Sequence, residues 1–566
     1  MIEIPHEVLS EHLEEHMRGR RLVSAVFSTF QFEPGFFEQE VLPVFFDVNL
    51  SQAPAIRIIQ LEDSLRASNA RIAVYYDANG LIASDEGSAK LDVVRIPVRH
   101  RTGIFHCKNV LAVVEDLVAD DAGNHPRTLL VVTLSANLTR AGWWKNVEAC
   151  HVEALPERGT SRLRTGLLDF IAVIRSRSPA AVDHAALDEV HAFVKQTTQG
   201  SFRSKEGELF AHFYGGTQAF VDFLVDTAGE ELRGLNLEII SPFFDKDEES
   251  APLAELVRRL KPIETRVFLP RNDAGAALVA PELYDWVAEH HDIQWGALPG
   301  ALTKTSNSDA AVSRNVHAKV YRFFSRKPKR EYVIIGSVNL TRPAHQQGGN
   351  VESAVLMQTA PVRRPEFWLV VDGNKPNEFG SPDDPDGDDG AATSGSRLAL
   401  RFDWATAQAE AYWDDAAPSP ELQLLSGGVR QFVLRNVGSR AWEPIPDEAA
   451  QVLKRNLEST SFLDVQGDRS EQVTILVLED GMWKKPPMLS RLSLQDILKY
   501  WSMLSLEQRN EFLGSRAAEL LGPAALNGLV AHVPRTPEID SIFERFAGMF
   551  HAFECVREGV MTALED

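Results

Sequence analysis

Apolar residues gather in short runs that alternate along the chain with stretches of helical period. LVSAVFSTF at 22–30 and ARIAVYYD at 70–77 are largely apolar, which is typical of strands covered on both faces. LNLEIISPFFD at 235–245 and TRVFLP at 265–270 predict two more strands, and PLAELVRRL at 252–260 between them has the period of a helix. Strands that alternate with helices predict an α/β fold in which helices cover both faces of mixed sheets.

The pattern changes after residue 371. Segment 372–396 is acidic and rich in Gly, Pro and Ser, so it has little apolar surface to bury and predicts a flexible linker. Apolar runs with strand character follow over 397–480 and predict a β-rich domain. Capping-box sequences at 493 and 505, and the pair Thr536-Pro537, then predict a helical C-terminal region over 481–566.

The same polar residues recur in the same order in two places. The first copy holds His106, Lys108, Asn137 and Glu148, and the second holds His317, Lys319, Asn339 and Glu352. The lysine and the asparagine are 29 residues apart in the first copy and 20 in the second, so the polar positions recur although the spacing differs. Packing alone would repeat apolar positions. The repeat therefore predicts one site built from two pseudo-symmetric halves, which we place at 1–200 and 201–371.

An imidazole, an ammonium and a carboxamide from each copy suit a phosphodiester. One histidine can attack phosphorus to form a phosphohistidine, while the other protonates the leaving oxygen and then activates water. The lysines and asparagines can bind the nonbridging oxygens, and each glutamate can accept the Nδ1 proton of a histidine. Because protein cations supply the positive charge, we expect neither a metal nor another cofactor.

The duplicated His-x-Lys with a following Ser-x-Asn resembles the phospholipase D superfamily over about residues 20–360. Many members carry an aspartate five residues after the lysine, where this chain has Val113 and Phe324. That departure, together with SANLTRAGW at 135–143, is similar to the tyrosyl-DNA phosphodiesterase branch, whose motif is His-x-Lys followed by Asn.

The resemblance implies a nuclease-like phosphodiesterase that acts on nucleic acid, DNA rather than RNA. It implies His106 as the nucleophile and His317 as the acid and then the base. Bacterial members of the superfamily often serve as nuclease parts of defence or restriction systems, so a defence or DNA-processing role is a further expectation.

The net charge of −22 is unevenly distributed. Between Arg314 and Arg330 there are seven Lys and Arg residues and no acid. The acidic total argues against nonspecific coating of DNA, but it is compatible with a local basic groove. Trp143 and Trp144 follow the first asparagine, and one of them, for which we select Trp143, either stacks on a base or fills the core. The residues that we expect to bind substrate are Ser135, Trp143, Arg326, Lys327, Lys329, Arg330 and Ser337.

Two other functions stay open. A lipid phosphodiesterase would need an apolar entrance, yet the sequence around His317 is basic. A non-catalytic nucleic-acid-binding or assembly subunit would keep the motifs without cleavage. In either nucleic-acid function the C-terminal region could dock a helicase or another ATPase. The chain has no G-x-x-x-x-G-K-[ST] loop, so an ATP-driven step would come from such a partner.

The apolar runs are too short for a membrane helix, and the N-terminus lacks the basic start and apolar stretch of a secretory signal. The three cysteines are widely spaced, which does not fit a disulfide framework. We expect a cytoplasmic protein without a membrane partner.

Overall fold

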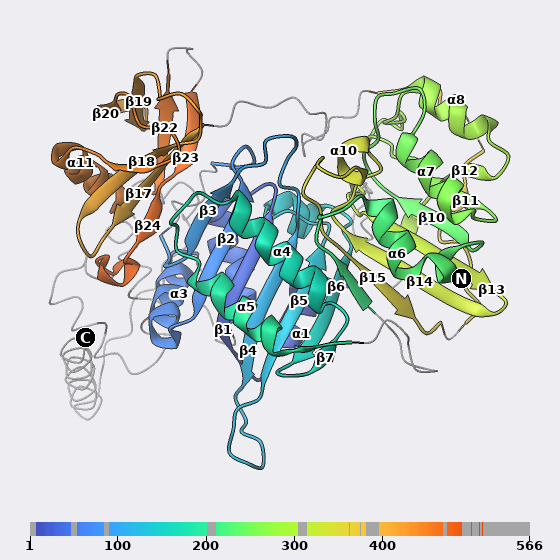
Figure 1. Ribbon diagram of the computed structural model, residues 1–566, viewed down its shortest axis with the longest axis horizontal. Coiled ribbons are helices and arrows are strands. Elements are labelled where there is room, and N and C mark those ends of the chain that lie inside the picture. The colour runs from blue at the N-terminus through green and yellow to red at the C-terminus, as the bar shows by residue number, and fades with distance from the viewer. Residues whose placement is uncertain are drawn as a thin grey trace.

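We describe the protein from a computed structural model (Figure 1). The described residues are 7–46, 54–83, 90–200, 211–303, 314–361, 363–373, 375–380, 396–467 and 472–488, together with Tyr500, Arg509 and Phe512. The fold is mixed α/β, which confirms the predicted class. Most of the predicted linker and nearly all of the predicted C-terminal helices lie outside the described residues.

The first sheet has six strands in the order β3-β2-β1-β4-β5-β6. Strands β1, β2 and β3 are parallel, whereas β4, β5 and β6 each run antiparallel to the preceding strand in the sheet. The strands are β1 (Arg20–Thr29), β2 (Arg71–Asp77), β3 (Val94–Val98), β4 (Asn109–Asp116), β5 (Arg127–Leu134) and β6 (Cys150–Pro156).

The strands of this sheet are apolar on both faces because both faces are covered. In β1, Ala25 and Phe27 belong to one hydrophobic core, and Val26 between them belongs to the other. Helices α4 and α5 cover the face seen in Figure 1. The remaining elements of this region are α1 (Leu9–Met17), α2 (Pro34–Phe36), η1 (Phe37–Val41), η2 (Leu42–Phe45), α3 (Pro54–Ser68), η3 (Ala141–Lys145), β7 (Thr160–Ser161), α4 (Arg164–Arg177), α5 (Ala185–Gln196) and β8 (Thr198–Gln199).

The second sheet has eight strands in the order β16-β12-β11-β10-β13-β14-β15-β9. Its six central strands, from β12 to β15, repeat the order and the directions of the first sheet. The strands are β9 (Ala211–Tyr214), β10 (Asn236–Ile240), β11 (Thr265–Phe268), β12 (Ile293–Ala297), β13 (Val320–Arg326), β14 (Lys329–Gly336), β15 (Ala354–Thr359) and β16 (Val370–Val371).

Helix α7 (Ala251–Leu260) shows how the sequence sets the elements of this region. The Ser250 hydroxyl accepts a hydrogen bond from the Leu253 backbone N–H at the start of the helix, and Lys261 in a left-handed conformation ends it. Leu253, Leu256 and Leu260 lie on one buried face. The other helices are α6 (Phe220–Leu232), α8 (Pro281–Glu289), α9 (Gly300–Thr303) and α10 (Arg342–His345).

A third region contains two four-stranded sheets, β21-β18-β17-β24 and β20-β19-β22-β23. It packs against the first sheet through β24 and β3, and the Trp442 Nε1–H donates to the Ala180 carbonyl at 2.6 Å. Its elements are β17 (Leu398–Asp403), β18 (Gln408–Trp413), β19 (Leu422–Ser426), β20 (Val429–Leu434), β21 (Trp442–Pro444), α11 (Asp447–Leu457), β22 (Phe462–Gln466), β23 (Gln472–Leu476), β24 (Leu478–Asp480) and η4 (Met482–Lys484). Of all the helices described, none is long and apolar enough to span a bilayer.

Candidate active site

The repeated polar residues lie at equivalent ends of the two sheets. His106 and Lys108 come directly before β4, and His317 and Lys319 come directly before β13. Asn137 follows β5, and its counterpart Asn339 follows β14. β4 and β5 are antiparallel neighbours, and so are β13 and β14. The histidine and lysine of each copy therefore lie at the same end of the sheet as the asparagine of that copy.

Two short backbone bridges join these sheet ends to each other. Phe105 pairs with Val351, and Val147 pairs with Val316. In each bridge, the residue that precedes a histidine pairs with the residue that precedes the glutamate of the other copy. The His106 N–H donates to the Val351 carbonyl at 2.9 Å, and the His317 N–H donates to the Val147 carbonyl at 2.9 Å.

Near these bridges, each histidine of one copy pairs with the glutamate of the other copy. His106 Nδ1 lies 2.9 Å from Glu352 Oε2, and His317 Nδ1 lies 2.7 Å from Glu148 Oε1. Each glutamate of one copy thus accepts the Nδ1 proton of the histidine of the other copy, which leaves Nε2 as the reactive nitrogen. The two histidines and the two glutamates therefore form one cluster.

The two serines of the repeat hold the glutamates. The Ser135 hydroxyl donates to Glu148 and accepts from the Ala149 N–H, and the Ser337 hydroxyl does the same with Glu352 and the Ser353 N–H. Both serines are fully buried behind the carboxylates. Their hydroxyls donate to the carboxylates that accept from the histidines, and contact of these serines with substrate stays a prediction.

Two asparagines that precede the glutamates complete this support. Asn350 Nδ2 donates to Glu352 Oε1 at 3.3 Å, and Asn146 Nδ2 donates to Glu148 Oε1 at 3.4 Å. Asn350 Oδ1 also accepts the Ile104 N–H, next to the bridge before His106. The sequence signal for these residues is their own repetition two positions before each glutamate.

Both lysines are buried beside their histidines. Lys319 Nζ lies 2.8 Å from His317 Nε2 and donates to the His317 carbonyl at 3.0 Å. Lys108 Nζ donates to the His106 carbonyl at 3.2 Å, and its side chain is fully buried. The cluster thus contains two ammonium groups and two carboxylates, so their charges balance when both imidazoles are neutral.

Three further residues line the cluster at the ends of β1 and β10. The Gln31 N–H donates to Asn137 Oδ1 at 3.2 Å. The ring of Phe30 lies 5.7 Å from His106, and the ring of Phe243 lies 5.8 Å from His317, between ring centroids. None of the three is among the predicted site residues: Phe30 and Phe243 lie within the predicted strands 22–30 and 235–245, and Gln31 directly follows the first. His106 has no exposed surface and His317 keeps 4%, so a phosphate reaches them only when the covering side chains move.

The charges around Glu148 favour its ionised form. Burial alone would raise the pKa of this carboxyl, but His317, Lys319 and Ser135 outweigh burial, and its pKa lies below the usual 4.5. Ionisation of Glu148 therefore stabilises the fold fully above pH 4.5, and this contribution is lost as the pH falls through the lowered pKa.

Glu148→Gln should lower the free energy of unfolding at pH 7 by about 3 kcal/mol, because it removes the negative charge that faces His317 and the buried Lys319. Below pH 4.5 the difference from the wild type should shrink, since the wild-type carboxyl is then being protonated. Urea unfolding across this pH range measures it. Glu448→Gln, an exposed glutamate of α11, serves as a control and should change stability by less than about 0.5 kcal/mol. If the difference in free energy of unfolding between Glu148→Gln and the wild type persists unchanged at acid pH, the charge of Glu148 does not supply this stability.

Trp143 lies away from the cluster. It is only 7% exposed and packs in the hydrophobic core of the first sheet. This burial favours the second of the two predicted alternatives for Trp143, core filling.

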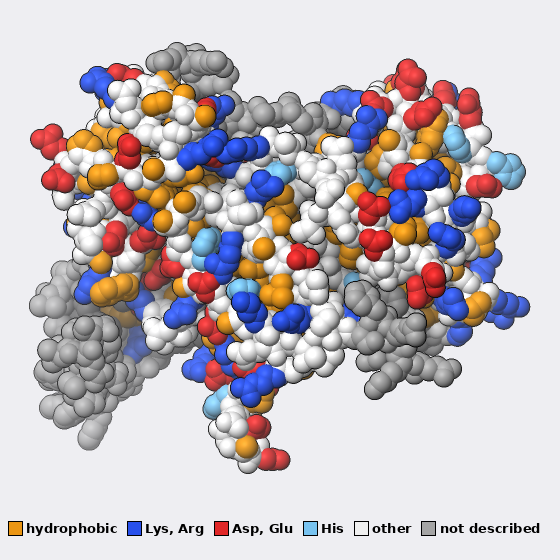
Figure 2. Space-filling model, viewed as in Figure 1, with side chains coloured by type: hydrophobic (Ala, Val, Ile, Leu, Met, Phe, Trp, Pro, Cys, Tyr) orange, Lys and Arg blue, Asp and Glu red, His pale blue; other side chains and the backbone are white. Residues whose placement is uncertain are grey.

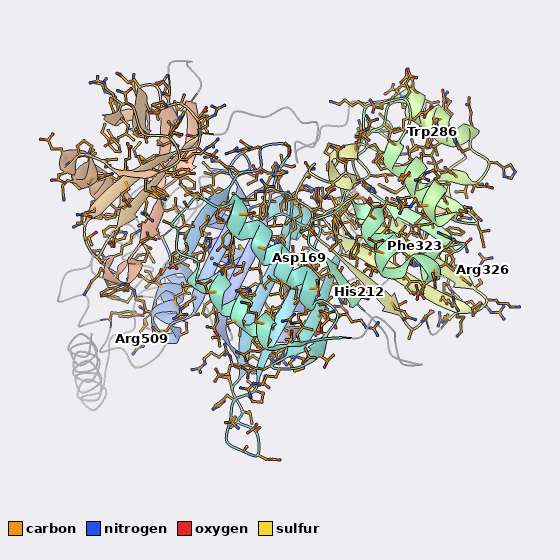
Figure 3. The ribbon with its side chains drawn as sticks, viewed as in Figure 1. Asp169, His212, Trp286, Phe323, Arg326 and Arg509 are labelled. Atoms are coloured by element: carbon orange, nitrogen blue, oxygen red, sulfur yellow. The ribbon has the colours of Figure 1, made fainter. Side chains whose placement is uncertain are left out.

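The basic run lies at the opposite end of the second sheet. Arg326 ends β13 and Lys329 begins β14, so both occupy the turn that joins these strands. Seven strand residues separate this turn from Lys319, which corresponds to about 20 Å. Figure 3 shows Arg326 at the outer edge of the sheet, and Figure 2 shows acidic and basic side chains interspersed over the viewed face. Contact with substrate stays a prediction for the four basic residues Arg326, Lys327, Lys329 and Arg330. Such a contact would lie outside the cluster.

Within the described residues, no group of three or more His, Cys, Asp or Glu side chains is placed to hold a metal ion.

Cys107 lies between His106 and Lys108 but points away from them, and its thiol donates to the Val351 carbonyl. Burial raises the pKa of this thiol, which disfavours the nucleophilic thiolate.

The fold is similar to solved structures of yeast tyrosyl-DNA phosphodiesterase. One of them is 12% identical, with a TM-score of 0.36, and covers 62% of this chain and 85% of its own. A mutant of that enzyme is 11% identical, with a TM-score of 0.39, and covers 63% and 87%. Polyphosphate kinase from Porphyromonas gingivalis is 11% identical, with a TM-score of 0.31, and covers 62% of this chain and 42% of its own.

No protein-family model matches the sequence, and no curated protein matches it.

Proposed function

We propose that this chain is a phosphodiesterase that cleaves nucleic acid, DNA rather than RNA, through a phosphohistidine intermediate. The observation that carries the proposal is the pair of crossed His–Glu hydrogen bonds, which joins two His-Lys-Asn sets into one cluster. A single set offers one imidazole, whereas displacement at phosphorus with a poor leaving group needs a nucleophile and an acid. Two oriented imidazoles meet that need.

In the first step, His106 Nε2 attacks phosphorus and the bond to the leaving oxygen breaks. His317, protonated on Nε2, gives that proton to the departing alkoxide. In the second step, His317 takes a proton from water, the resulting hydroxide attacks phosphorus, and the P–N bond breaks to release the phosphate product. Glu352 and Glu148 retain the Nδ1 hydrogen bonds throughout.

The lysines and asparagines bind the nonbridging oxygens. Lys319 now lies 2.8 Å from His317 Nε2, and a bound phosphate would draw its ammonium toward the more negative oxygen. Asn137, held through Oδ1 by Gln31, can turn its amide N–H groups toward the same phosphate. These donors stabilise the charge that develops in the transition state.

The shared strand order of the two sheets supports a pseudo-symmetric pair of halves, at 1–200 and 201–371, as the scaffold of this site. The role in bacterial defence or DNA processing rests on the family resemblance alone. The proposed docking of a helicase or another ATPase falls mostly on residues 489–566, nearly all of which lie outside the described residues.

Cleavage should persist in millimolar EDTA, because the ammonium groups of Lys108 and Lys319 supply the positive charge that a metal would otherwise supply. Labelled single-stranded and double-stranded oligonucleotides, incubated with the purified protein with and without EDTA, test this. A magnesium-dependent nuclease in the same buffers confirms chelation. Activity that EDTA abolishes and Mg²⁺ restores would contradict the mechanism, and hydrolysis of phosphatidylcholine vesicles but of no oligonucleotide would favour the lipid alternative.

A further inference from the structure

An exposed tryptophan lies in the chain segment that connects two of the repeated polar residues. The chain from Asn137 to Glu148 passes through the π-helical turn η3, which carries Trp143 and Trp144. Trp143 points into the core, and Trp144 points outward with 44% of its surface exposed. The backbone of this turn is fixed, because the Asn146 N–H donates to the Ala141 carbonyl at 3.0 Å. An exposed large aromatic side chain is thus held on a hydrogen-bonded turn in the segment that joins Asn137 to Glu148.

The indole of Trp144 is braced from within the protein. The Arg140 guanidinium lies 4.7 Å from the Trp144 ring and 5.3 Å from the Phe36 ring. Phe36 is fully buried and meets Trp144 edge to face at 5.0 Å. The Arg140 backbone N–H donates to Glu33 Oε2 at 3.1 Å, which anchors the arginine. Little side-chain freedom then remains for Trp144 to lose when a ligand binds.

The second copy has no such aromatic residue. Counting from the asparagines, Arg342 corresponds to Arg140, and Gln346 corresponds to Trp144. Arg342 forms an ion pair with Asp247 at 2.6 Å instead of stacking on a ring. The two copies share their catalytic residues and differ at this position, so the aromatic side chain is not required by the repeated scaffold.

We propose that Trp144, backed by Arg140, is a stacking site for an unpaired base of the substrate. The inference rests on the proposed function and deepens it, because it assigns a single-stranded segment to the first-copy side of the scissile phosphate. A flat exposed indole accepts any base, and the adjacent guanidinium attracts the phosphate backbone. The site should therefore favour single-stranded over fully paired substrates, with little sequence preference.

Trp144→Ala should weaken binding of a single-stranded oligonucleotide about ten-fold, whereas Trp144→Phe should retain most of the affinity. Fluorescence anisotropy of a labelled oligonucleotide measures binding independently of cleavage. The salt dependence of binding should keep its slope in Trp144→Ala, since stacking releases no counterion. A duplex of the same length should bind the wild type and Trp144→Ala equally.

Trp483→Ala is the matched control. Trp483 is 56% exposed, with Lys484 Nζ 4.1 Å from its ring centroid, but it lies in η4 of the third region. This variant should bind as the wild type does. Equal binding by wild type and Trp144→Ala, or a loss equal in Trp483→Ala, would overturn the stacking site, and so would a loss accompanied by a reduced salt slope. A wild type that binds but does not cleave would instead refute the proposed catalysis, so the two failures are distinguishable.

Discussion

His106→Asn should abolish turnover, by at least about a thousand-fold, and should form no covalent adduct with any leaving group. The variant removes the attacking nitrogen. His317→Asn should be slow with nucleic acid, but with a nitrophenyl phosphodiester it should accumulate phosphoryl-His106, because nitrophenolate departs without an acid while no base remains to activate water. Mass analysis under conditions that preserve phosphohistidine, after reaction with the nitrophenyl ester, measures both results.

The same experiment tests which histidine is the nucleophile and which is the acid. An adduct on His317 in the His106→Asn variant would reverse the roles of the two histidines. If neither variant forms an adduct while the wild type still turns over, the covalent mechanism is excluded. Thermal unfolding of both variants shows whether loss of activity reflects loss of the fold.

Glu352→Gln should lower kcat/KM by about 10²–10⁴, although the residue does not contact the substrate. The amide keeps the shape of the carboxylate, but it can donate to His106 Nδ1 and so favour the wrong tautomer. The pH profile should change with it, since the charge that stabilises the protonated imidazole is lost. Steady-state kinetics on the nitrophenyl ester over a range of pH measures both effects.

The matched control for this variant is Glu238→Gln. Like Glu352, Glu238 is a buried glutamate, but its partner is Arg322, at 2.5 Å, and not a histidine. It should destabilise the fold without changing kcat/KM or the pH profile of the folded enzyme. If both variants lose activity to the same extent, Glu352 is a structural residue and not a positioning one.

The sequence predicted much of the scaffold, because strands and helices leave local signals. The apolar runs at 22–30 and 70–77 correspond to β1 and β2, and the run at 252–260 corresponds to α7. The grouping of the repeated histidines, lysines and asparagines also followed from sequence order. These features depend on side-chain period and repetition, which are visible in the chain itself.

The partners within the site could not be predicted in the same way. Glu352 lies 246 residues from His106, and no local pattern states which histidine a given glutamate will meet. Similarly, the motif that places Ser337 two positions before Asn339 does not show that the hydroxyl faces a carboxylate. Trp143 and Trp144 are adjacent, and the sequence does not show which of the two is buried. The packing of the first sheet buries Trp143 and leaves Trp144 exposed.

The crossed hydrogen bonds also determine how much of the chain must be synthesised before the site can form. Ribosomes deliver the N-terminal part first, and domains generally fold as they emerge. His106 is therefore synthesised and surrounded by its own sheet well before Glu352 exists. Until that residue has been added and the second sheet has docked, the imidazole lacks the acceptor that selects its tautomer. A chain that ends before Glu352 therefore lacks the hydrogen bond that selects the His106 tautomer.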